Sequence, residues 1–108
     1  MANPWSGEVA LTIDGQERAL KLTLGALAEL EADLETGSLL ELVARFEEGR
    51  FSTRDVLSLI VAGLRGGGAD LRAADLLRAD IQGGPVAAAQ AAALLLARAF
   101  TVPESPAG

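Results

Sequence analysis

Residues 8–24 read EVALTIDGQERALKLTL, and large apolar residues alternate with other residues on both sides of Asp14-Gly15, at Val9, Leu11 and Ile13 and at Leu20, Leu22 and Leu24. This period of two predicts two β-strands. Asp14-Gly15 favours a type I′ turn between the strands, because both central positions of that turn take a positive φ. The two-residue loop also predicts the register, since cross-strand partners are found by counting outward from it. The expected pairs are Ile13 with Gln16, Leu11 with Arg18, Val9 with Leu20 and Glu8 with Lys21.

An isolated hairpin is marginally stable in water, so its apolar face should rest on helices. Helical periodicity with glycine or proline punctuation predicts five of them in the rest of the chain. The first is expected to end before Gly37, and the second to run from Leu39 to Glu48 with Ser38 as its cap. The third is expected to begin after a cap at Ser52 or Thr53. The fourth is expected from Leu71 to Ile81 with Asp70 as its cap, and the fifth from Pro85 to Phe100. The expected fold is therefore α+β and mostly α, with an N-terminal β-hairpin followed by about five short helices in a compact bundle.

Apolar spacing on these helices predicts which side chains are buried. The expected apolar faces include Leu24, Leu27, Leu30 and Leu34 on the first helix and Leu76, Leu77 and Ile81 on the fourth. Between the third and fourth helices, Gly66-Gly67-Gly68 predicts a flexible break in the chain. Residues 1–100 are expected to form a single domain, and residues 101–108, which contain two prolines, a disordered tail.

The composition excludes several kinds of chemistry. The 108-residue chain has no cysteine and no histidine, and its one lysine is Lys21. Disulfides, thiol nucleophiles, histidine general bases and cysteine or histidine metal ligands are therefore excluded. The net charge of -6 argues against a nucleic-acid partner, because grip on a phosphate backbone relies on clustered Lys and Arg.

The sequence also lacks membrane and secretion signals. Its longest apolar stretch, Val86 to Ala97, is shorter than the roughly 20 residues that span a bilayer. The N-terminus has neither a basic region nor an apolar core of the kind found in signal peptides. We therefore expect no membrane partner and a cytoplasmic location.

Acidic residues are dense between Glu29 and Glu48, where seven carboxylates accompany one base, Arg45. One interpretation is an electrostatic docking face for a basic partner. Its residues would be Glu29, Glu31, Asp33 and Glu35. The alternative is a solvated helix surface, which is the usual meaning of a helical charge run. A calcium site would need oxygen ligands along a loop with a glycine turn, and this run is helical, so we expect no metal and no other cofactor.

The remaining motifs do not indicate an enzyme. Gly66-Gly67-Gly68 lacks the Gly-Lys-Ser/Thr ending of a phosphate-binding loop and follows a helix instead of a strand. Serine hydroxyls need a nearby base to act as nucleophiles, and histidine is absent. The sequence therefore favours a protein that binds over one that catalyses.

The fifth predicted helix, residues 85–100, is apolar almost all round. It fits a central core helix, which is the interpretation we favour. It also fits a face left open for a partner or for a second copy of the chain, as in a homo-oligomer.

The order of five segments carries a further signal. They are GEVALTIDG (7–15), RALKLTLGALAELE (18–31), GSLLEL (37–42), FSTRDV (51–56) and IVAGLRGGG (60–68). Together they resemble the small proteins encoded in the tail-gene region of gene transfer agents and related siphophages. The resemblance extends over residues 7–100, and the family has been labelled both a tail tube protein and a tail assembly chaperone.

This resemblance implies a non-enzymatic assembly chaperone that holds the tape-measure protein and tail-tube subunits soluble until the tube polymerises. Its location would be the bacterial cytoplasm or the tail of a phage-like particle. We prefer the chaperone to a tube subunit, because a closed β-ring needs long strands and the sequence predicts one hairpin. Two alternatives remain open: a structural tail component retained in the particle, and a small helical adaptor or regulator unrelated to phage tails.

Overall fold

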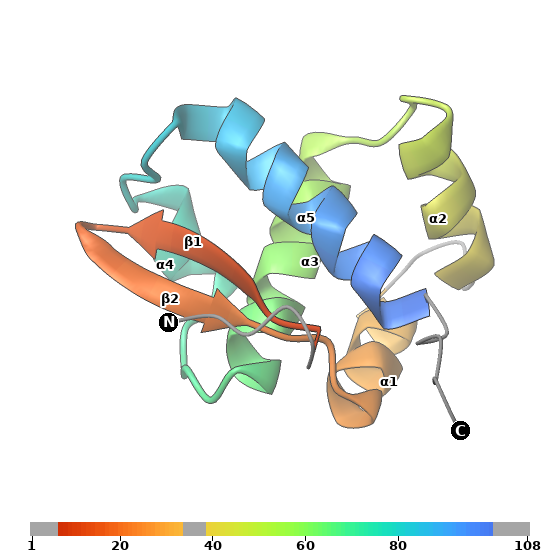
Figure 1. Cartoon of the computed structure of the whole chain (residues 1–108), viewed down its shortest axis with the longest axis horizontal. Helices are drawn as coiled ribbons and strands as arrows, with labels where there is room; N and C mark the ends of the chain where they lie inside the picture. The colour runs from red at the N-terminus through yellow and green to blue at the C-terminus, as the bar shows by residue number, and fades with distance from the viewer. Residues whose placement is uncertain (1–6, 34–38, 101–108) are drawn as a thin grey trace, which may run out of the picture.

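The computed structural model describes residues 7–33 and 39–100, and Figure 1 shows how their elements are arranged. The chain begins with a hairpin of two strands, β1 (Val9–Ile13) and β2 (Gln16–Leu20). Within the described residues, the helices that follow are α1 (Leu24–Asp33), α2 (Leu39–Glu47), α3 (Thr53–Gly66), α4 (Ala73–Leu77) and α5 (Gly84–Phe100). The expected architecture, a hairpin followed by five short helices, is confirmed.

The hairpin has the predicted register. β1 and β2 pair antiparallel from Ile13–Gln16 at the turn to Val9–Leu20 at the open end. Asp14 and Gly15 have φ values of 51° and 79°, as a type I′ turn requires. One face of the hairpin is buried through Val9, Leu11, Ile13 and Leu20.

Beyond the Val9–Leu20 pair, the two strands bond to different helices. The amide of Lys21 donates to the carbonyl of Gly63 in α3 at 2.9 Å. The guanidinium of Arg98 in α5 donates to the carbonyl of Glu8. The predicted pair of Glu8 with Lys21 is therefore not part of the ladder, and the hairpin is held by both helices.

The central helix is α3, which packs against β2, α1, α4 and α5. In Figure 1, α5 crosses in front of α3, with the hairpin on one side and α2 on the other. The core is aliphatic, as the low aromatic content predicts. Its largest fully buried side chains are Leu20, Leu30, Leu42, Leu59, Ile60, Leu64 and Leu95.

A reciprocal capping box begins α3. The hydroxyl of Ser52 accepts a hydrogen bond from the Asp55 amide at 3.1 Å, and the Asp55 carboxylate accepts one from the Ser52 amide at 2.9 Å. Each bond satisfies a backbone donor that the first helical turn leaves free. Of the two predicted caps, Ser52 is therefore the correct one.

Gly66 and Gly67 form a close contact where the sequence predicted a flexible break. Gly66 is the last residue of α3 and Gly67 its C-cap. A Cβ atom on Gly66 would lie 1.8 Å from the carbonyl oxygen of Lys21, and one on Gly67 would lie 2.1 Å from that of Ala19. Both distances are sterically impossible, so glycine lets the end of α3 touch the backbone around β2.

The apolar stripe predicted for the first helix is partly wrong. Leu30 is buried, but Leu24 is 84% exposed. The hydroxyl of Thr23 accepts a hydrogen bond from the Ala26 amide at 3.0 Å, so Thr23 caps α1. Leu24 is consequently the first helical residue, ahead of the turns that pack on α3.

The fourth helix is shorter than predicted, because residues 80–82 pair with the hairpin. The amide of Gln82 donates to the Thr12 carbonyl at 3.0 Å, and Ile81 forms a bridge with Ile13. The predicted Asp70 cap is also wrong, since the Asp75 carboxylate accepts from the Arg72 amide at the start of α4. Leu77, expected in the core, is 73% exposed.

The fifth helix is both core and surface. It buries Ala88, Ala91, Ala92, Leu95 and Leu96 and leaves Val86, Leu94 and Phe100 exposed. Other predictions lie outside the described residues. These are the apolar role of Leu34, the stop at Gly37, the Ser38 cap and the tail at residues 101–108.

Candidate partner-binding surfaces

The predicted acidic face is only partly within the described structure. Glu29 and Glu31 are exposed on α1. Asp33 is the last residue of α1, and Glu35 lies outside the described residues. The carboxylate of Glu29 lies 3.0 Å from a guanidinium nitrogen of Arg65 in α3, so its charge already has an internal partner.

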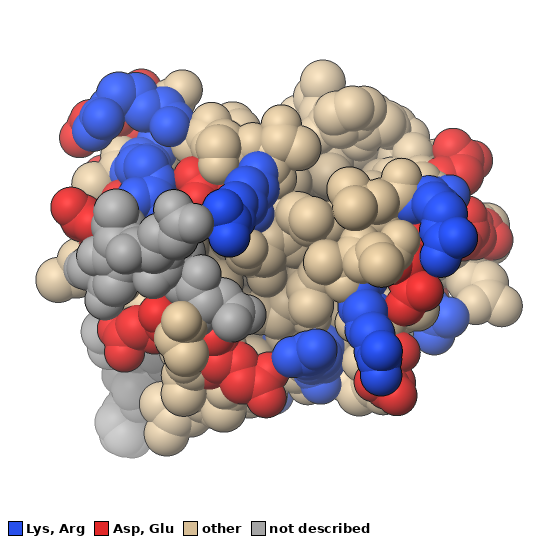
Figure 2. All heavy atoms as spheres, turned by 180° about the vertical axis from the view of Figure 1, so that it is seen from behind, with Lys and Arg blue, Asp and Glu red and all other residues tan. Residues whose placement is uncertain are grey.

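Figure 2 shows the molecule from the side opposite to Figure 1. Acidic and basic side chains are interspersed around an uncharged central area on this face. The charges visible there therefore make no large patch of one sign.

A groove between α3, α4 and the start of α5 is the larger candidate site. Its volume is about 540 Å³, and its lining is mostly apolar. This volume lies within the usual range for ligand and cofactor pockets. Its three sides are formed by α3, α4 and α5, which contribute Ile60, Leu76 and Ala88 among other residues.

One helical stripe of α3 runs along the groove. Thr53, Val56, Leu57 and Ile60 all line it and follow the spacing i, i+3, i+4, i+7. This spacing places the four residues on one face of α3. The capping box at Ser52 fixes where α3 begins, and so where this face starts.

Asp80 is the charged residue in the lining of the groove. Its amide donates to the Asp14 carboxylate at 2.8 Å, and its carbonyl accepts from the Asp14 amide at the same distance. This reciprocal pair joins the hairpin turn to the segment between α4 and α5. Asp14 and Asp80, which both carry a carboxylate, therefore lie side by side at the part of the groove that Asp80 lines.

A comparison with known families decides what kind of protein this is. The sequence model of a family described as "phage tail tube protein, GTA-gp10" matches residues 6–102. The chain belongs to this family. No curated protein and no solved structure matches it.

Membership confirms the broader part of the resemblance, a protein of the tails of gene transfer agents and phages. The family description names a structural protein and not an enzyme. It does not mention an assembly chaperone, so that narrower role is taken up below as a proposal.

Two structural findings on this tail-family member concern acidic clusters and helix length. In the described ranges, 7–33 and 39–100, acidic side chains do not gather in threes around a place where a metal ion could sit. Among the same residues, every helix is too short or too polar to cross a membrane.

The groove of this tail-family member is connected to α2 through Phe51. Phe51 lines the groove and stacks on Phe46 of α2, with ring centroids 4.5 Å apart and planes 8° from parallel. The ion pair of Arg45 with Asp55 lies next to this stack in the sequence and also joins α2 to α3. The position of α2 therefore helps to fix one end of the groove.

Sequence reasoning missed the groove as a site. The signal that could have found it is the pair Leu76-Leu77, because adjacent side chains of a helix do not lie on the same face. The α3 stripe has ordinary helical spacing, which by itself does not distinguish a core face from the wall of a groove. Only the placement of α4 and α5 shows that part of it is left uncovered.

Proposed function

We propose that this chain is a non-enzymatic tail protein that works by binding other tail proteins through apolar helix surface. One observation carries the proposal, the match to a tail tube family over residues 6–102. The absence of histidine and cysteine from the sequence supports binding over catalysis. The groove between α3, α4 and α5 supplies apolar surface for such binding.

The first candidate is a structural component that remains in the finished tail. The family description names a tail tube protein, so it favours this alternative over the chaperone that the resemblance implied. A retained component would bind its neighbours in the tail through surfaces that are exposed in the single chain. It could also bind further copies of itself, since tails are built from repeated subunits.

The second candidate is an assembly chaperone for the tape-measure or tail-tube protein. The fold favours it through one feature: within the described residues, β1 and β2 are the only strands, and each has five residues. A tube wall built as a closed β-ring needs longer strands that pair between subunits. A mostly helical protein is better suited to covering the helical or apolar segments of another chain.

Quantitative mass spectrometry of purified particles separates the two candidates. A structural component is expected in particles at a fixed copy number relative to the tape-measure protein. A chaperone is expected in the producing cells and absent from the particles. The tape-measure protein, measured in the same sample, serves as the reference.

Co-expression tests the shared part of the proposal. The chain is expected to co-purify with the tail tube protein or the tape-measure protein of the same gene cluster, and a chaperone should also increase the soluble fraction of that partner. If the chain is missing from particles and co-purifies with neither protein, both candidates are wrong.

The acidic run from Glu29 to Glu35 belongs to this proposal as a steering surface. Glu29, Glu31, Asp33 and Glu35 would attract a basic partner and speed its association. Reversing one charge, as in Glu31→Lys, should then slow association by about twofold to fivefold and weaken its salt dependence. Equal association rates at low salt would leave these residues as an ordinary solvated surface.

A further inference from the structure

Three hollows or patches on the described surface could hold a partner. At the acidic end of α1, Glu29 is already paired with Arg65. A second hollow between α1 and α3 is lined by Arg54 and Arg65, and both arginines already have partners. The groove between α3, α4 and α5 is larger and apolar, and it contains Asp80.

We propose that this groove binds an amphipathic helix of another tail protein. The helix would place large apolar side chains on the groove floor and a Lys or Arg next to Asp80. This proposal rests on the proposed function, because it names the surface and the partner chemistry through which the chain binds a tail protein.

The shape of the groove fits a helix. The stripe from Thr53 to Ile60 offers about 10 Å of helix face, or two turns, for a partner to pack along. On the opposite wall, α5 presents the small side chains of Ala88 and Ala89. Small residues allow another helix axis to approach closely, and ridges of the partner can then enter the space between α3 and α5.

The rim of the groove provides apolar surface that a partner could cover. Leu77 in the lining is 73% exposed, and Phe51, which also lines the groove, is 36% exposed. Covering both side chains removes apolar area from water, which is the main driving force for association. An amphipathic helix does this with side chains at i, i+3, i+4 and i+7.

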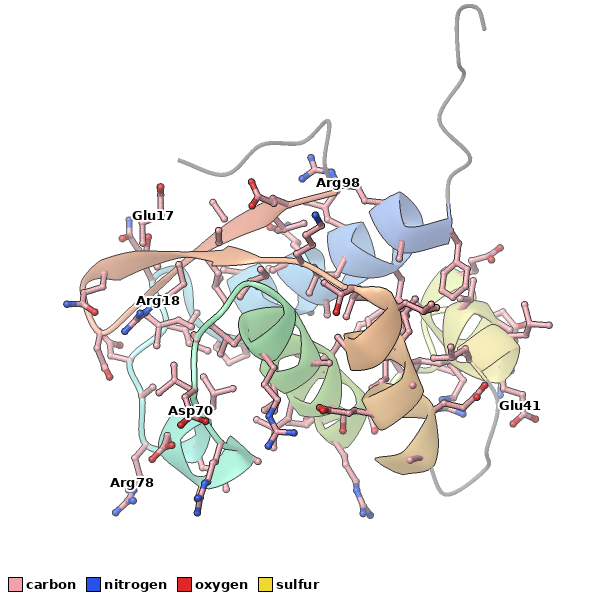
Figure 3. All side chains as sticks on the ribbon, turned by 90° about the horizontal axis from the view of Figure 1, so that it is seen from below. Glu17, Arg18, Glu41, Asp70, Arg78 and Arg98 are labelled. Atoms are coloured by element: carbon pink, nitrogen blue, oxygen red, sulfur yellow. The ribbon has the colours of Figure 1, made fainter. Side chains whose placement is uncertain are left out.

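The charge at Asp80 favours a basic partner. No hydrogen bond or ion pair reaches the Asp80 carboxylate from residues 7–33 or 39–100, and the Asp14 residue that bonds its backbone is also acidic. Arg78, the nearest base in the sequence, points outward from α4 in Figure 3. A second copy of this chain, with its net charge of -6, would bring further carboxylates, so repulsion disfavours it.

A pair of designed peptides tests the chemistry directly on the full chain. One is an 18-residue helix of Leu and Lys with a single apolar face; the other has every Lys replaced by Glu. Fluorescence anisotropy should show the Lys peptide binding at least about tenfold more tightly than the Glu peptide. Equal affinities, or tighter binding of the Glu peptide, would overturn the charge argument.

Matched variants place the binding in the groove. Leu77→Ser should weaken binding of the Lys peptide about tenfold, and Asp80→Lys about fivefold or more. The controls are Leu24→Ser, at another exposed leucine, and Glu17→Lys, which reverses a charge on the side of the hairpin opposite α4 in Figure 3. Both controls should stay within twofold of the wild type. If controls and groove variants weaken binding equally, the groove is not the site.

The same variants, co-expressed with the tail tube and tape-measure proteins, separate this proposal from the proposed function. Loss of co-purification with Leu77→Ser and Asp80→Lys, but not with the controls, supports both. If all variants co-purify as the wild type does, the function stands and the groove proposal fails. If the wild type co-purifies with neither protein and is absent from particles, the function fails. A Leu77→Cys variant tests for a second copy in the groove, because the wild-type chain has no cysteine. A disulfide-linked dimer of this variant would show that a second copy occupies the groove and would contradict the proposal.

Discussion

The guanidinium of Arg45 in α2 donates two hydrogen bonds to the carboxylate of Asp55 in α3, at 3.1 and 3.0 Å. The same carboxylate accepts from the Ser52 amide at the start of α3. One side chain therefore caps α3 and joins α2 to it. Among the described residues, Asp55 is the charged residue that is buried, and its carboxylate forms an ion pair with Arg45.

Removing the Asp55 carboxylate should destabilise the protein. Asp55→Ala deletes the cap and leaves the half-buried Arg45 guanidinium without these two bonds, so we expect a loss of about 2–3 kcal/mol in the free energy of unfolding. Urea denaturation followed by circular dichroism measures it. The exposed carboxylate of Glu47 in α2 is the control, and Glu47→Ala should change stability by less than about 0.5 kcal/mol. Equal effects of the two substitutions would contradict the role of Asp55.

The stability should fall at acidic pH because of the same carboxylate. Burial raises the pKa of Asp55, but the hydrogen bonds from the Ser52 amide and the Arg45 side chain, together with the Arg45 charge, outweigh it and hold the pKa below its ordinary value of 3.8. The unfolded chain therefore binds a proton at a higher pH than the folded chain does. The stability that the ionised Asp55 carboxylate contributes is therefore present above pH 3.8 and is lost as the pH falls through the lower pKa of the folded state.

Urea titrations at pH 7 and pH 3 test this linkage. The wild type should lose more stability between the two values than Asp55→Asn, which cannot titrate at this position. An identical pH dependence in both proteins would mean that other carboxylates account for the acid sensitivity.

Alanine should not be tolerated at the end of α3. Gly66→Ala and Gly67→Ala place a Cβ 1.8 and 2.1 Å from backbone oxygens, so the end of α3 must move away from β2. We expect each to lower stability by about 3 kcal/mol or more. Gly25→Ala in α1 is the matched control, because its Cβ would lie 3.9 Å from the nearest atom and alanine favours helix. Thermal melting of the three variants should show a large decrease for the first two only.

Two leucines four positions apart should respond very differently to truncation. Leu20 is fully buried, whereas Leu24 is exposed at the start of α1. Leu20→Ala should lower the free energy of unfolding by about 2–5 kcal/mol, because apolar burial is lost and a cavity is left behind. Leu24→Ala should change stability by less than about 0.5 kcal/mol. Chemical denaturation gives both values, and a similar cost at the two positions would contradict the described packing.

The hairpin could be predicted from the sequence because its signals are local. Asp14-Gly15 defines the turn, and the register follows by counting from it. The start of α3 was predictable for the same reason, since Ser52 and Asp55 lie within one helical turn. Fold class, an N-terminal hairpin and a mostly helical remainder follow from such local patterns.

The features that sequence reasoning missed depend on distant partners. Residues 80–82 leave the helical pattern because the edge of β1 binds them. The requirement for glycine at Gly66 comes from the backbone of Lys21, 45 positions earlier in the chain. The groove exists only once α4 and α5 are placed beside α3, so its residues looked like ordinary core positions in the sequence.

The contact between Arg98 and the Glu8 carbonyl joins two residues 90 positions apart in the chain. β1 therefore gains its neighbour α5 only after α1, α2, α3 and α4 have all been synthesised. Such long-range closure is slow compared with the formation of a local turn or helix. On the ribosome, α3 can cover the β2 side of the hairpin first, whereas β1 lacks its helix neighbour until α5 has left the exit tunnel. Among the described elements, β1 is thus synthesised before the others and gains its neighbour α5 after all of them.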